Sequence, residues 1–108
     1  MNNINNDTVI SGTQVKMNVH IDPLGNIHMS DYNFECKFYI FPKKTVVIKK
    51  EDMVKIDDDN YIALIDTTGL GIGKLHLTLT AQIPDADFGN IFRREIACVD
   101  TGITIVNC

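Results

Sequence analysis

The chain has 108 residues, of which 44% are hydrophobic and 22% are charged, and its formal net charge is -4. A chain of this length builds one hydrophobic core and not two. Lys and Arg total 10 against 14 Asp and Glu, which excludes nonspecific binding to nucleic acid or to an anionic membrane, because both need surplus positive charge.

The N-terminus and the cysteines indicate a reducing compartment. Residues 1–7, Met-Asn-Asn-Ile-Asn-Asn-Asp, lack the basic and apolar regions of a secretory signal, and no apolar run approaches the roughly 20 residues that span a bilayer. We therefore expect the protein to be made in a cytosol and to stay there or in a particle assembled there. Three widely spaced cysteines fit that setting. We expect Cys36 and Cys98, which lie within apolar alternations, to be buried, and Cys108 to be exposed.

Apolar and polar residues alternate along most of the chain, which predicts β-strands with one solvent-facing side. In chain order, the expected strands cover residues 13–22, 27–29, 33–41, 45–48, 61–65, 74–82, 93–99 and 103–106. Turn residues separate them at 22–26, 42–44, 57–60 and 100–102, and a single helical turn is expected at 49–53. The strand at 61–65 is apolar throughout, so we expect cover on both of its faces.

Two longer connections flank the strand at 74–82. Residues 67–73 contain three glycines and form a flexible loop unless Leu70 packs in the core, and residues 83–90 form a connection and not a strand. Short strands with regular turns predict an all-β fold. We expect a single-domain antiparallel β-sandwich, immunoglobulin-like or related, in residues 13–108, preceded by a flexible N-terminal arm in residues 1–12.

Several polar clusters invite a metal or nucleotide site, but none fits one. Residues 57–60, Asp-Asp-Asp-Asn, lack the glycine and glutamate spacing of a calcium loop and predict a solvated turn. Asp85 and Asp87 are spaced to share a metal, yet this segment favours acceptance of backbone N–H groups in its own turn. Residues 69–74 lack the spacing of a phosphate loop and precede a strand instead of a helix. We therefore expect no metal and no cofactor.

The three histidines, His20, His28 and His76, form no short metal-binding pair, and neither serine lies in a nucleophile elbow. A Cys-His pair from distant positions stays open, but nothing in the sequence favours it. We expect that the protein is not an enzyme, and a hydrolase dependent on His76 is the third-ranked hypothesis.

Three segments in the second half of the chain occur in an order that other proteins share. They are Asp-Thr-Thr-Gly-Leu-Gly-Ile-Gly-Lys-Leu at residues 66–75, Ile-Pro-Asp-Ala-Asp-Phe at residues 83–88 and Thr-Gly-Ile-Thr-Ile at residues 101–105. Across residues 32–106 the chain resembles small β-domains in virion proteins of phages and prophages of the Bacteroidales, including crAss-like phages. The resemblance implies a virion structural protein, assembled in the bacterial cytoplasm, that decorates the capsid or attaches fibres to head or tail.

Partners implied by the resemblance are capsid, fibre or tail subunits, and a homo-oligomer is expected. Related domains often continue into a stalk, whereas this sequence stops at Cys108, so a stand-alone adaptor or decoration subunit is favoured. We expect loops, edge strands and the N-terminal arm to bind partners. The candidate partner-binding residues are Asn2, Asn3, Ile4, Leu70, Ile72, Asp85, Asp87 and Phe88. The alternative is a carbohydrate-binding β-sandwich for host attachment, for which Tyr32, Tyr39 and Tyr61 are the candidate stacking residues.

Overall fold

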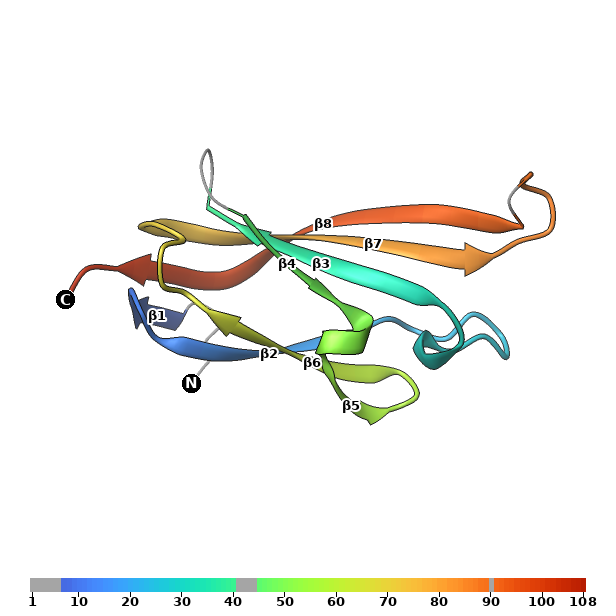
Figure 1. Cartoon of the computed structure of the whole chain (residues 1–108), viewed down its shortest axis with the longest axis horizontal. Helices are drawn as coiled ribbons and strands as arrows, with labels where there is room; N and C mark the ends of the chain where they lie inside the picture. The colour runs from blue at the N-terminus through green and yellow to red at the C-terminus, as the bar shows by residue number, and fades with distance from the viewer. Residues whose placement is uncertain (1–6, 41–44, 90) are drawn as a thin grey trace.

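The computed structural model describes residues 7–40, 45–89 and 91–108, and these residues form eight strands in two sheets (Figure 1). The strands are β1 (Asp7–Ile10), β2 (Gln14–His20), β3 (Asn33–Tyr39), β4 (Thr45–Lys49), β5 (Val54–Asp57), β6 (Asn60–Asp66), β7 (Gly73–Pro84) and β8 (Phe92–Val106). Two single 3₁₀ turns, η1 (Met29–Asp31) and η2 (Lys50–Asp52), complete the elements. The prediction of an all-β sandwich is confirmed.

One sheet has five strands in the order β1-β8-β7-β3-β4, and the other has three in the order β2-β6-β5. All pairs are antiparallel except β1 and β8, which run parallel from the pair Asp7 and Ile103 to the pair Ile10 and Val106. This one parallel pair differs from the antiparallel sandwich expected from the sequence, and every other pair agrees with it. The parallel pair arises because the first strand lies beside the last one and no hairpin connects them.

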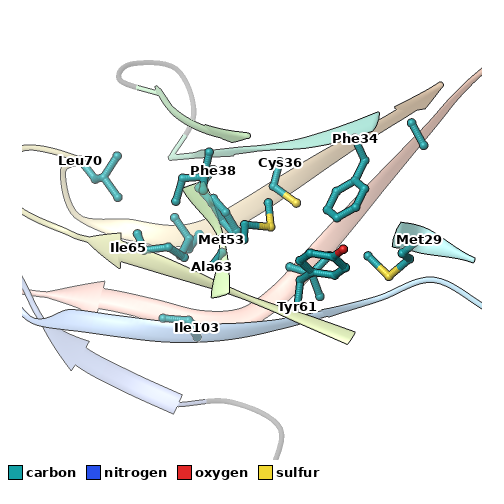
Figure 2. Close-up of a cluster of buried hydrophobic side chains, with 14 of the residues drawn as sticks. Met29, Phe34, Cys36, Phe38, Met53, Tyr61, Ala63, Ile65, Leu70 and Ile103 are labelled. Carbon is teal, nitrogen blue, oxygen red and sulfur yellow. The ribbon is translucent and has the colours of Figure 1, made fainter. Parts of the chain in front are cut away.

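The core lies between the two sheets and follows the alternation in the sequence. Phe34, Cys36 and Phe38 of β3 are buried, and they face the buried side chains of Tyr61 and other β6 residues (Figure 2). The rings of Phe34 and Tyr61 meet edge to face with centroids 5.1 Å apart. Each large apolar side chain buried here contributes about 1.5–3 kcal/mol, so this contact layer holds the sheets together.

The sequence-based prediction differs from the structure at three places in the sandwich. The outward side chain Leu64 of β6 is 50% exposed, so β6 is covered on one face and not on both. No strand was expected at β5, and there Val54 and Ile56 are exposed at the edge of the three-stranded sheet. The return strand expected at residues 27–29 is also wrong. Ile27 forms a single bridge to Leu24, and η1 follows.

The connection expected at residues 83–90 begins later, because β7 continues through Pro84. The tight turn expected at residues 100–102 is wrong, since β8 runs through it as one strand. A bulge absorbs the turn residues: Gly102 takes a φ of 79°, and its N–H donates to Oδ1 of Asp100 at 2.9 Å. Thr101 Oγ1 donates to the Leu75 carbonyl at 2.7 Å, which holds the bulge against β7.

Part of the expected N-terminal arm is a strand. β1 pairs with the last residues of β8, and Ser11 N–H donates to the Val106 carbonyl at 2.8 Å. The sandwich therefore begins at Asp7 and not at residue 13, because the edge of β8 supplies backbone partners for residues 7–10. The rest of the expected arm, residues 1–6, and the turn expected at residues 42–44 lie outside the described residues.

Candidate interaction surface

The most exposed part of the fold is the β7–β8 arm, which we define as residues 77–89 and 91–99. The arm extends to one end of the long axis of the molecule (Figure 1). On the face of the five-stranded sheet that is turned toward the other sheet, paired side chains become more exposed from β3 through β7 to β8. Phe38 is buried, Leu77 beside it is half-buried, and Val99 beyond is 46% exposed. The three-stranded sheet is too narrow to cover β8, so β8 is open on both faces along the arm, whereas Ala81 and Ile83 of β7 stay buried.

One edge of β8 is also free. Within the described ranges, β1 pairs only with residues 103–106, and no strand lies beside residues 92–100 on that side. We call residues 92–100 the β8 edge. Asp85 N–H donates to the Ile91 carbonyl at 2.9 Å, so the regular antiparallel alternation directs the odd-numbered residues of β8 toward β7. The backbone groups of the even-numbered residues therefore point outward, where another strand can bind.

The tip of the arm combines charge and exposed aromatic rings. Arg93 Nη1 binds Asp85 Oδ2 at 2.7 Å, and the guanidinium also contacts Glu95. The Asp85 carboxylate accepts the N–H of Asp87 at 3.0 Å, and this bond and the bond from Arg93 lower the pKa of Asp85. The turn-forming role expected for Asp85 is confirmed. Phe88, which is 49% exposed, and Phe92 line a shallow pocket together with the arginines of β8.

The glycine-rich loop at residues 67–73 lies at the other end of β7. Leu70 is 2% exposed, so it packs in the core, as expected if the loop is held in place, and it is not available to a partner. Thr67 is fully buried; its Oγ1 donates to the Thr13 carbonyl at 2.7 Å and accepts the Gly12 N–H at 2.9 Å. These bonds fasten the loop to the turn between β1 and β2.

The histidines and their aspartate neighbours have structural contacts. His28 Nδ1 and Asp59 Oδ2 are 2.8 Å apart, and His20 bonds to both the Asp59 carbonyl and the Asp22 carboxylate. The hydrogen bond that His20 donates to the Asp22 carboxylate raises the pKa of His20, and the one that His28 donates to the Asp59 carboxylate raises the pKa of His28. His76 instead lies against Tyr39, with ring centroids 5.6 Å apart. The first two histidines thus tie the turn between β5 and β6 to the connection after β2.

The turn at residues 57–60 has its own hydrogen bonds. Asp57 Oδ1 accepts the Asp59 N–H at 2.9 Å and the Asn60 amide at 2.8 Å, as expected of a turn. In the part of the chain that the structure describes, no three His, Cys, Asp or Glu side chains gather to hold a metal ion.

The three cysteines differ in exposure. Cys36 is buried, as expected, and burial raises the pKa of its thiol to about 12. Cys108 is exposed, which is also as expected. The prediction for Cys98 is wrong: it is exposed, because neither face of β8 is covered at that point.

The structure brings together only some of the candidate partner-binding residues. Asp85, Asp87 and Phe88 share the tip of the arm, whereas the exposed Ile72 lies at the opposite end of β7. Asn2, Asn3 and Ile4 lie outside the described residues. The β8 edge was not predicted as a binding surface. The sequence does show that this segment has charged residues at both ends, Arg94 and Asp100, with the apolar residues 96–99 between them.

Comparisons with protein-family models, with curated proteins and with solved structures found no match to this chain. Among residues 7–40, 45–89 and 91–108, no helix has the length and apolarity needed to cross a membrane. The fold and its exposed arm are therefore the basis for any functional proposal.

Proposed function

We propose that this chain is a non-enzymatic structural protein of a phage particle, and that it decorates the capsid or attaches fibres to head or tail. The protein acts by binding neighbouring subunits, resides in the virion and is assembled in the cytoplasm of the bacterial host. The motif resemblance in residues 66–105 suggests the particle, and the open arm suggests how the protein binds.

The observation that carries the proposal is the exposure of the β7–β8 arm. At its tip Phe88 and Phe92 are each nearly half exposed, beside the ion pair of Asp85 and Arg93. Exposed aromatic rings next to arginine are typical of protein interfaces, where they become the most buried contacts. The tip is therefore the surface proposed to bind other subunits.

The carbohydrate-binding alternative gains no support from the tyrosines. Tyr32 and Tyr61 are buried in the core, and the partly exposed Tyr39 lies against His76. A sugar-stacking face needs exposed rings, so these three residues do not provide one together.

The test is incorporation into particles. The wild-type protein should co-purify with phage particles at a fixed stoichiometry, measured by quantitative mass spectrometry of gradient-purified virions. Phe88→Ser should reduce its incorporation at least about tenfold, because truncating an interface anchor costs about 2 kcal/mol or more.

Leu64→Ser is the matched control, since Leu64 is 50% exposed but lies on β6 in the other sheet. This variant should enter particles as the wild type does. A wild-type protein that stays free of particles would overturn the proposed function. Equal incorporation of both variants would overturn the role of the tip.

A further inference from the structure

The β8 edge has a charge pattern that is complementary to itself. Arg94 lies three residues before Ala97, and Asp100 lies three residues after it. Ile96 and Cys98 flank Ala97, and both are exposed, Ile96 at 60%. When two copies of this segment run antiparallel with Ala97 at the centre, each Arg94 lies opposite an Asp100 of the second copy.

The paired groups also lie on the same face of the sheet. Arg94, Ile96, Cys98 and Asp100 pair in register with Gln82, Thr80, Thr78 and His76 of β7. These four β7 residues lie between the inward-facing Leu75, Leu77, Leu79, Ala81 and Ile83, so their partners on β8 point outward. Opposite charges directly across two antiparallel strands stabilise the pair.

Backbone geometry permits the same pairing. The even-numbered residues of the β8 edge direct their N–H and C=O groups outward. In the Ala97-centred register these residues meet only other even-numbered residues, namely Arg94 with Asp100 and Ile96 with Cys98. Four such pairs supply about eight backbone hydrogen bonds, and each five-stranded sheet becomes continuous with that of the second copy.

Neighbouring registers are less favourable. Centring on Ile96 places Arg94 opposite Cys98, and centring on Cys98 places Asp100 opposite Ile96. Centring on Glu95 places two carboxylates together. Only the Ala97-centred register pairs both charges, so electrostatics selects it.

We propose that two copies of this chain associate through the β8 edge as a twofold-symmetric antiparallel pair centred on Ala97. This contact closes a free edge strand and covers the exposed Ile96 and Val99. It stands independently of the proposed role in a phage particle, because it requires only a second copy.

Disulfide trapping tests the register. The background is Cys98→Ser with Cys108→Ser, which leaves only the buried Cys36. In this background Ala97→Cys should form a covalent dimer under mild oxidation, because a non-hydrogen-bonded antiparallel pair brings its Cα atoms to about 4.5 Å, within disulfide range. Asn18→Cys, an exposed position on the edge strand β2, is the matched control and should stay monomeric.

The two rival registers have their own readouts. Ile96→Cys in the same background reports a pair centred on Ile96, and the Cys108→Ser variant, which retains native Cys98, reports a pair centred on Cys98. Cross-linking by either of these and not by Ala97→Cys would overturn the proposed register.

Charge reversal tests the pairing without a covalent bond. In sedimentation equilibrium, Arg94→Glu should weaken dimerisation at least about tenfold, because two attractive pairs become two repulsive ones. Lys16→Glu on β2 changes the net charge equally and should leave the dimer unchanged. Adding Asp100→Lys to Arg94→Glu should restore dimerisation, and circular dichroism should verify that each variant is folded.

Other occupants of the edge give different results. A full-length chain that is monomeric at high concentration, with no cross-linking by Ala97→Cys, would overturn the proposal in favour of an unlike partner. A dimer that forms only when the chain starts at Asp7 would assign the edge to residues 1–6. A dimer in solution without particle incorporation would contradict the proposed function alone, and incorporation without a dimer would contradict this inference alone.

Discussion

The buried hydroxyl of Thr67 offers a sharp test of how the glycine-rich loop is held. The side chain is fully buried, and its Oγ1 both donates to the Thr13 carbonyl and accepts the Gly12 N–H. Thr67→Val keeps the shape of the side chain and removes only these two hydrogen bonds. The change therefore isolates the polar contribution of one residue.

The expected loss can be worked out from the partners left behind. The Thr13 carbonyl keeps a bond from the Thr67 N–H at 3.2 Å, so it stays satisfied. The Gly12 N–H loses its acceptor, but residue 12 is exposed and water replaces it, so the two lost hydrogen bonds together cost about 1–3 kcal/mol, at about 0.5–1.5 kcal/mol each. The added methyl group offsets up to about 0.8 kcal/mol. We expect Thr67→Val to lower the free energy of unfolding by about 1 kcal/mol.

Urea unfolding followed by circular dichroism measures this change. For a slope of about 1.5 kcal/mol/M, the midpoint should fall by roughly 0.7 M. Thr67→Ser keeps the hydroxyl and loses one buried methyl group, so it should cost only about 0.8 kcal/mol. Thr8→Val, at an exposed threonine of β1, should leave the midpoint unchanged. If Thr67→Val leaves the midpoint at the wild-type value, the hydroxyl does not hold the loop.

Two further predictions concern titrating groups. Because its pKa is raised by Asp59, His28 should contribute stability that is full below pH about 6.5, its ordinary pKa, and lost as the pH rises through the folded-state value. His28→Gln should therefore reduce the fall in urea midpoint between pH about 5.5 and 8; an unchanged fall would contradict this assignment. Burial, and to a lesser extent the charge of Glu35, raise the pKa of the Cys36 thiol to about 12. Iodoacetamide at pH about 8 should therefore label the exposed Cys98 and Cys108 of the native protein and leave Cys36 unlabelled. Mass spectrometry of the labelled peptides measures this, and rapid labelling of Cys36 would show that the core opens.

The sequence predicted best those strands that have one buried side. In β2, β3 and β7 the side chains change direction at every step, and only one direction meets the other sheet, so the alternation is directly visible. The same pattern fails for β8, where Cys98 lies between apolar neighbours and is still exposed. Which strand extends past the second sheet depends on the widths of both sheets, and local alternation does not encode that.

Turn chemistry was a second source of error. Residues 100–102, Asp-Thr-Gly, have the composition of a reversal, and Gly102 does adopt a positive φ. Thr101 nevertheless bonds to the Leu75 carbonyl on β7 and keeps the strand running. The sequence could not distinguish a bulge from a turn, because both use the same residues and only the neighbouring strand decides.

The candidate site was predicted only in part. Asp85, Asp87 and Phe88 lie together at the tip of the arm, as their closeness in the sequence suggests, but only Asp87 and Phe88 are exposed, and Asp85 is half-buried. Ile72 lies a whole strand away from them, and Leu70 is a core residue. The β8 edge was missed because a free edge is a property of strand order, which single-sequence patterns do not reveal.

The pairing of β1 with the end of β8 has a consequence for how the protein is made. Residues 7–10 leave the ribosome long before their partners at residues 103–106. The five-stranded sheet is therefore complete only after residues 103–106 have been synthesised, and contacts between such distant residues slow folding. Until then residues 7–10 of the nascent chain lack their strand partner, which makes assistance from a chaperone valuable during translation.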